Sequence, residues 1–139
     1  MPFSLSLIPE AKRGNFIVGN VIRMCIDDDK RAAGAALRAR LKSYFLQPQY
    51  PNYWIEAGYE EEMAAALAAV KAKDLERLDT LMTDEWLADV ALYGDAPEVL
   101  DGVEAWHDAG VTILSIDPIS TSGSEERAFD ELFETFART

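Results

Sequence analysis

Two stretches of the chain are apolar at nearly every position. Residues 16–26 are rich in β-branched and other apolar side chains, and residues 111–116 repeat this composition near the other end of the chain. Continuous apolar runs of this length are typical of strands that are buried on both faces, as in parallel sheets. The pattern therefore predicts two parallel strands separated by a long helical region.

The region between the two runs has helical periodicity instead. Ala33, Leu37 and Leu41 recur on one face of a helix predicted for residues 30–46, and Pro48 and Pro51 are expected to stop it. One residue of the acidic run 27–29 should cap this helix. Shorter helices are expected at residues 53–57, from Glu60 through Val70, at residues 75–82, and at residues 84–93 after an N-cap at Thr83.

A loop, a helix and a helix stop precede the second predicted strand. Asp95 and Glu98 have the spacing of a capping box, and Pro97 falls in the first helical turn, where its missing N–H does no harm. Ala109 and Gly110 end this helix and lead into the strand. The arrangement is typical of the last α-to-β step of a βαβ fold.

The last helix carries an aromatic stripe. Ser122 and Glu125 have capping-box spacing, and the stripe that follows has the i, i+3, i+4, i+7 pattern: Phe129, Leu132, Phe133 and Phe136. If this stripe docks on the core, the Phe133→Ala substitution should lower the free energy of unfolding by about 3–5 kcal/mol.

Composition limits the number of domains, the binding partners and the cellular location that are expected. The chain has 139 residues, which fits a single domain over residues 1–139, and a net charge of −12. Such an acidic protein is not expected to bind nucleic acid or anionic membranes, which require clustered Lys and Arg. Cys25 is the one cysteine, so no internal disulfide is possible and a cytoplasmic location is expected. We find no membrane span and no secretory signal pattern.

Several residues are candidates for chemistry, each with a structural alternative. Asp117 follows the second predicted strand, where barrel active sites gather, and His107 is the one histidine. Cys25 fits a buried inert thiol better than a nucleophile. The aspartates at 27–29 fit helix capping better than cation binding, and no metal-ligand cluster is predicted. Gly94 and Asp95 begin a helix that could hold a phosphate, although the acidic Asp95 argues against this.

An aromatic cluster lies between the helix predicted for residues 30–46 and the helix predicted from Glu60 through Val70. Tyr50, Tyr53, Trp54 and Tyr59 occur within ten positions of one another. Packing in a core or interface is the simpler interpretation, and stacking on a planar ligand is the alternative.

The order of these motifs resembles the C-terminal part of luciferase-like monooxygenases, in particular the flavin- or deazaflavin-dependent oxidoreductases. The resemblance covers residues 14–118 and includes the first strand with its aspartates, the Tyr50–Tyr59 aromatics, and the Pro97-Glu98-Val99 and Ala109-Gly110-Val111-Thr112 motifs. It departs from the family pattern where Asp95 and Ala96, two residues instead of one, separate Gly94 from Pro97.

The resemblance implies part of a (β/α)8 barrel. The two predicted strands would be the seventh and eighth, and the first six would be missing. FMN or deazaflavin is the implied cofactor, but the missing strands carry most of the family's contacts to it. The cofactor-binding residues therefore stay unknown, and Asp117 and His107 remain the catalytic candidates.

Two functions of different class follow. The chain is either a segment or subunit of a luciferase-like oxidoreductase, inactive alone, or a non-catalytic module that self-associates or binds a protein partner. Two buried strands do not form an ordinary independent sheet. We therefore expect a homo-oligomer or a complex with the missing half of the barrel.

Overall fold

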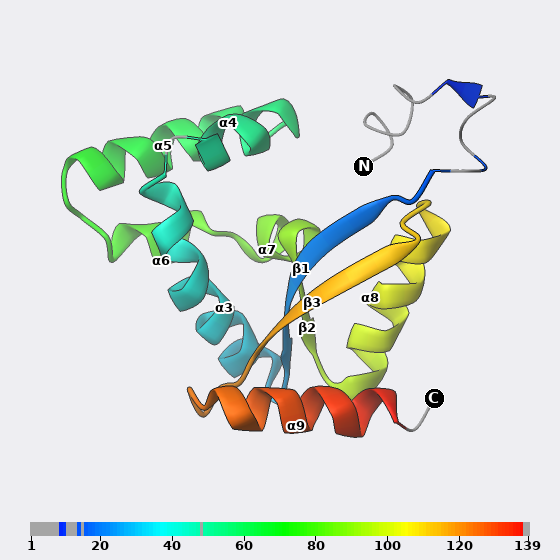
Figure 1. Cartoon of the computed structure of the whole chain (residues 1–139). Coiled ribbons are helices and arrows are strands. Elements are labelled where there is room, and N and C mark those ends of the chain that lie inside the picture. The colour runs from blue at the N-terminus through cyan, green and yellow to red at the C-terminus, as the bar shows by residue number, and fades with distance from the viewer. Residues whose placement is uncertain (1–8, 11–13, 15, 48, 138–139) are drawn as a thin grey trace.

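The computed structural model describes residues 9–10, 14, 16–47 and 49–137, and this part of the chain forms an α/β fold (Figure 1). Three strands make a parallel sheet: β1 (Gly19–Ile26), β2 (Ala91–Gly94) and β3 (Ile113–Ile119). Their order in space is β2-β1-β3, so that β1 is central.

Seven helices surround this sheet in the described residues. They are α3 (Lys30–Phe45), α4 (Gln49–Glu56), α5 (Glu60–Lys71), α6 (Arg77–Leu81), α7 (Asp84–Val90), α8 (Ala96–Asp108) and α9 (Glu125–Phe136). In Figure 1, α3 to α6 lie on one side of the strands, α8 lies on the other, and α9 crosses one end.

The alternation of side chains along β1 divides the core into two clusters. Cys25 joins the larger cluster, which packs α3 to α7 together with Ala91 of β2. Ile22 and Met24 point the other way and form the smaller cluster with Leu92 and Val99. Both faces of the carboxyl half of β1 are covered. For this reason its residues do not alternate between apolar and polar, as the apolar run of the sequence indicated.

The sequence predicted two strands and a helix over residues 84–93, and β2 corrects both predictions. Helix α7 ends at Val90, and Ala91–Gly94 then pairs with Arg23–Ile26 of β1. The residues of β2 alone do not distinguish a helix end from a short strand, and pairing with β1 decided between them. β1 and β3 do pair in parallel, with Ile22 opposite Ile116.

Most caps are where the sequence placed them. Asp29 accepts hydrogen bonds from the backbone N–H groups of Arg31 and Ala32 and begins α3. Asp95 and Glu98 form the expected capping box of α8. The cap of α9 is Ser124 rather than Ser122. Pro51 lies inside α4 instead of stopping a helix, and Pro48 lies outside the described residues.

The aromatic stripe of α9 does not dock as a whole. Leu132 and Phe136 pack against the smaller core cluster. Phe129 and Phe133 instead stack on each other at 6.2 Å on the outer side, and 65% of Phe133 is exposed. The condition for a cost of 3–5 kcal/mol in Phe133→Ala is therefore not met, because that ring is not docked on the core of the chain.

Among the described residues, no helix combines the length and the apolar character that crossing a membrane requires.

Candidate functional site

A cavity of about 810 Å³ opens between the helical side of the molecule and the amino-terminal half of the sheet. Its size falls within the range of small-molecule and cofactor sites. The lining residues come from β1 (Gly19, Asn20, Val21, Arg23), β3 (Ile113, Ser115), α3 (Leu41, Tyr44), α4 (Gln49, Tyr50, Tyr53, Trp54), α7 (Asp89, Val90) and α8 (Trp106).

The cavity lies beside the amino-terminal half of the sheet, where β2 does not pair with β1. β2 pairs with β1 only from Arg23 to Ile26. The preceding residues of β1, from Gly19 to Ile22, pair with β3 on one side and have no strand on the other among the described residues. Residues of this part of β1 line the cavity, and residues of α4 line it as well.

Arg23 is the central charged group of this site. It lies opposite Asp117 in the register of β1 and β3, and its Nε is 3.4 Å from Asp117 Oδ2. Its Nη2 donates to the Tyr44 hydroxyl, and its guanidinium carbon is 4.6 Å from the centre of the Tyr44 ring. Arg23 Nε is buried and forms no hydrogen bond of good geometry. The ion pair with Asp117 therefore compensates the buried charge of the guanidinium group.

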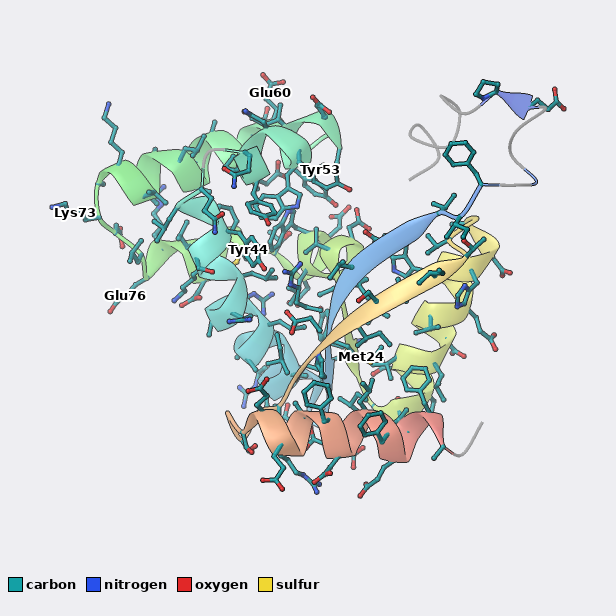
Figure 2. All side chains as sticks on the ribbon, in the orientation of Figure 1. Met24, Tyr44, Tyr53, Glu60, Lys73 and Glu76 are labelled. Carbon is teal, nitrogen blue, oxygen red and sulfur yellow. The ribbon has the colours of Figure 1, made fainter. Side chains whose placement is uncertain are left out.

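The predicted aromatic cluster divides into three parts in the structure. Tyr50 and Tyr53 line the cavity, and Figure 2 shows Tyr44 and Tyr53 in the region where α3 and α4 approach the strands. The Tyr50 ring meets Tyr44 edge-on at 4.5 Å. Trp54 also lines the cavity but is mainly a core residue, 6% exposed. Tyr59 does not line the cavity, but its hydroxyl donates to the carboxylate of Asp89, which does.

Tyr59 is a poor proton donor in this environment. Burial, with the Asp89 carboxylate next in importance, raises the pKa of Tyr59 well above its ordinary value. The packing interpretation therefore holds for Trp54, whereas Tyr53 is 64% exposed and stacking of its ring on a planar ligand stays a prediction.

Asp117 is inside β3 and not beyond its carboxyl end. It lies 3.4 Å from Arg23 Nε and 3.9 Å from Arg40 Nη2, so two cations compensate its charge. This arrangement suits a structural ion pair or the positioning of Arg23.

The other catalytic candidate, His107, lies in the last turn of α8 and makes a structural hydrogen bond there. Its Nδ1 is 2.7 Å from the Val111 carbonyl oxygen and must donate to it, which links the helix to the start of the following segment. Cys25 is fully buried in the larger core cluster. Burial is the main cause that raises the pKa of its thiol to about 12, so Cys25 is the inert thiol that the sequence favoured.

Two of the three aspartates at the carboxyl end of β1 have structural roles. Asp29 caps α3, and Asp27 accepts hydrogen bonds from Thr121 Oγ1 at 2.6 Å and from the backbone N–H of Asp29 at 2.8 Å. These bonds lower the pKa of the Asp27 carboxyl, that of Thr121 most. A second cavity of about 560 Å³ lies beside Asp27 and Asp28. No group of three metal-binding side chains occurs in the described part of the chain.

The start of α8 is occupied by its own side chains. Glu98 Oε2 accepts from the Asp95 backbone N–H at 3.1 Å, and Asp95 Oδ1 accepts from the Glu98 N–H at 2.9 Å. Lys30 Nζ then pairs with Glu98 at 2.6 Å. Carboxylates therefore satisfy the helix N-terminus, which disfavours the phosphate site considered at Gly94 and Asp95.

Sequence reasoning missed Arg23. The signal was available, since Arg23 is the single charged residue of the apolar run 16–26. A charge in such a run requires a partner, and the partner, Asp117, lies on a strand 94 positions away. The site as a whole is an aromatic-walled cavity with one compensated arginine, which is a binding geometry and lacks a paired acid and base.

Comparison with known proteins gives no relative to guide this interpretation: no family model, no curated protein and no solved structure matches the chain.

Proposed function

We propose that the chain is a segment of a luciferase-like, flavin- or deazaflavin-dependent oxidoreductase and that it acts only after further strands complete its sheet. The observation that supports this is an uncovered parallel sheet. Val21 and Ile113, on neighbouring strands, are 56% and 54% exposed. Parallel sheets occur almost only with both faces covered.

The pairing of β1 with β3 is compatible with this proposal, because the resemblance equates these two segments with neighbouring barrel strands. The position of β2 is less easily accommodated. Strands of a (β/α)8 barrel follow the order of the chain, whereas β2 lies on the far side of β1. On the proposal, β2 is an addition at the position beside β1, and the outer edges of the sheet remain open to further strands.

The first test is cofactor binding. We expect the isolated chain to bind neither FMN nor a deazaflavin with a Kd of about 1 μM or lower, which corresponds to roughly −8 kcal/mol. The physical reason is that the resemblance assigns most of the family's cofactor contacts to the first six barrel strands, which the matching segments do not include. Titration with each cofactor, followed by its fluorescence, measures this.

The matching positive experiment uses the DNA upstream of the Met1 codon. If that DNA encodes further barrel strands, the combined polypeptide should bind one of the two cofactors at least tenfold more tightly than the chain alone. Tight binding by the chain alone would contradict inactivity of the segment. Equal, weak binding by both polypeptides would contradict the oxidoreductase assignment.

The second test is the state of association. Exposed apolar side chains at Val21, at Ile113 and in the Phe129–Phe133 pair could be covered by a second copy of the chain, as exposed apolar patches often are. We expect light scattering during size exclusion, at low micromolar concentration, to give at least twice the monomer mass of 15.4 kDa. A monomer that melts cooperatively would argue that the chain closes its own core.

The alternative function is a non-catalytic module that self-associates. The stacked, outward-facing Phe129 and Phe133 of α9 favour it, because they form an apolar pair away from the cavity. Substituting Phe133 by Ser should return the chain to a monomer if this pair is the interface. If the open sheet is the interface, the Phe133→Ser variant should keep the mass of the unmodified protein.

A further inference from the structure

The ion pair of Arg23 has an excess of positive charge. Asp117 Oδ2 lies 3.4 Å from Arg23 Nε and 3.9 Å from Arg40 Nη2, so that two arginines share one carboxylate. These three groups are therefore positive as a set, in a chain whose net charge is −12. The carboxylate of a ligand would neutralise the set, because a guanidinium group binds carboxylates through parallel hydrogen bonds.

Arg23 has N–H groups left for such a ligand. Among the contacts of the described residues, Nε is paired with Asp117, and Nη2 donates one hydrogen to the Tyr44 hydroxyl. The guanidinium has further N–H groups, two of them on Nη1. Nε is the buried nitrogen of Arg23 that lacks a hydrogen bond, so Nη1 is accessible. Because Arg23 lines the cavity of about 810 Å³, a ligand in the cavity can reach it.

The Tyr44 hydroxyl offers a second donor next to Arg23. It accepts a hydrogen bond from Arg23 Nη2, and no acceptor for its own hydrogen occurs among the described residues. A hydroxyl group both accepts and donates, and its hydrogen rotates to suit an acceptor. Tyr44 also lines the cavity. Arg23 and Tyr44 together can therefore donate hydrogen bonds to one carboxylate.

Aromatic rings of α4 line the same cavity. The Tyr50 ring lies 4.5 Å from that of Tyr44, which places it close to the partner of Arg23. The Tyr53 ring is 64% exposed and is available for contact with a ligand. Planar apolar groups stack on such rings or meet them edge-on. The cavity thus combines a site for a carboxylate with a surface for an aromatic ring.

Asp89 limits the ligand to a single negative charge. This aspartate lines the cavity from α7, and the Tyr59 hydroxyl donates to its carboxylate. It would repel a second anionic group of the ligand, because like charges repel more strongly in a site that is partly shielded from water. The cavity therefore suits a monocarboxylate better than a dicarboxylate or a phosphate.

We propose that this cavity binds a planar aromatic monocarboxylate, with the carboxylate on Arg23 and Tyr44 and the ring beside Tyr50 and Tyr53. The cavity volume of about 810 Å³ has room for a ligand of two fused rings. The inference does not rest on the oxidoreductase assignment, because the chain alone supplies all of these groups.

Titration calorimetry of the unmodified chain with 2-naphthoate tests the proposal. We expect a Kd of about 100 μM or lower. The amide 2-naphthamide has the same shape but no charge, and it should bind about tenfold more weakly or worse, because hydrogen bonds between charged groups are the stronger ones. Equal affinity for the two compounds would overturn the proposal, as would the absence of 2-naphthoate binding.

A pair of arginine variants locates the carboxylate. Arg23→Lys keeps the positive charge but loses the forked guanidinium, and it should weaken 2-naphthoate binding about tenfold. Arg127→Lys is the matched control, because Arg127 is also paired with a carboxylate, that of Glu131, but lines the second cavity. It should bind 2-naphthoate as the unmodified chain does. Unchanged binding in Arg23→Lys, or a loss in Arg127→Lys alone, would overturn the proposal.

Two further measurements cover an Arg23→Lys variant that does not fold. Tyr44→Phe keeps the ring and removes one hydrogen bond, so it should weaken binding by about twofold to tenfold. In the unmodified protein, NOE contacts should connect the ring protons of bound 2-naphthoate with those of Tyr50 or Tyr53. Contacts only with the outward-facing rings of Phe129 and Phe133 would place the compound on α9 and overturn the proposal.

Discussion

Substituting Trp86 by Ala is expected to lower the free energy of unfolding by about 3–5 kcal/mol, the usual range for truncating a buried aromatic residue to alanine. Trp86 is 1% exposed and lies where α3, α4 and α7 meet. Its ring is 5.0 Å from that of Trp54 and 5.7 Å from that of Phe45. Its loss leaves a cavity that these two large rings cannot fill. Urea denaturation, followed by circular dichroism, measures the change.

Phe133→Ala is the matched control, because it also removes an aromatic ring but from a side chain that is 65% exposed. We expect it to change the free energy of unfolding by less than about 0.5 kcal/mol, as surface substitutions usually do. If Phe133→Ala costs as much as Trp86→Ala, α9 is buried in an interface between copies and the pair of variants should then differ in their dependence on protein concentration.

Substituting Gly94 by Ala is expected to destabilise the protein by about 2–4 kcal/mol. Gly94 has a φ of +131°, and backbone strain of this kind in a non-glycine residue costs about 1–3 kcal/mol. A Cβ there would also collide with the Glu98 carboxylate, whose carbon would lie at 2.8 Å. Glu98 would have to leave the capping box, and losing a cap costs about another 1 kcal/mol.

Gly58→Ala separates the two contributions. Gly58 also has a positive φ, +105°, but a Cβ there would meet no atom within 4 Å. We expect it to cost about 1–2 kcal/mol, from backbone strain alone. The same denaturation experiment compares both variants. Equal losses at the two positions would show that the contact between Gly94 and Glu98 relaxes without cost.

These stability measurements also bear on the proposal that the chain associates through its open sheet. Trp86 and Gly94 do not line the cavity beside the exposed side chains of Val21 and Ile113, so their variants should keep the association state of the unmodified protein. A variant that both unfolds more easily and dissociates would indicate that association and folding are one process. In that case stability depends on protein concentration.

The sequence determined those parts of the fold that depend on neighbouring residues. The capping residues Asp29, Asp95 and Glu98 were predictable, because a cap is a bond between side chain and backbone within one turn. The apolar runs predicted β1 and β3, and the periodicity predicted α3. The inert character of Cys25 also followed from its apolar surroundings in the chain.

Tertiary structure decided what depends on distant residues. Residues 91–94 became a strand because the edge of β1 was available to pair with them. The stripe of α9 divided into buried and exposed residues because one helix face meets only a narrow sheet. Arg23 and Asp117 form one site only because β1 and β3 are paired in register across 94 positions. Local sequence contains no information on which distant strand a residue will meet, and for this reason the site was not predictable while most of its supporting elements were.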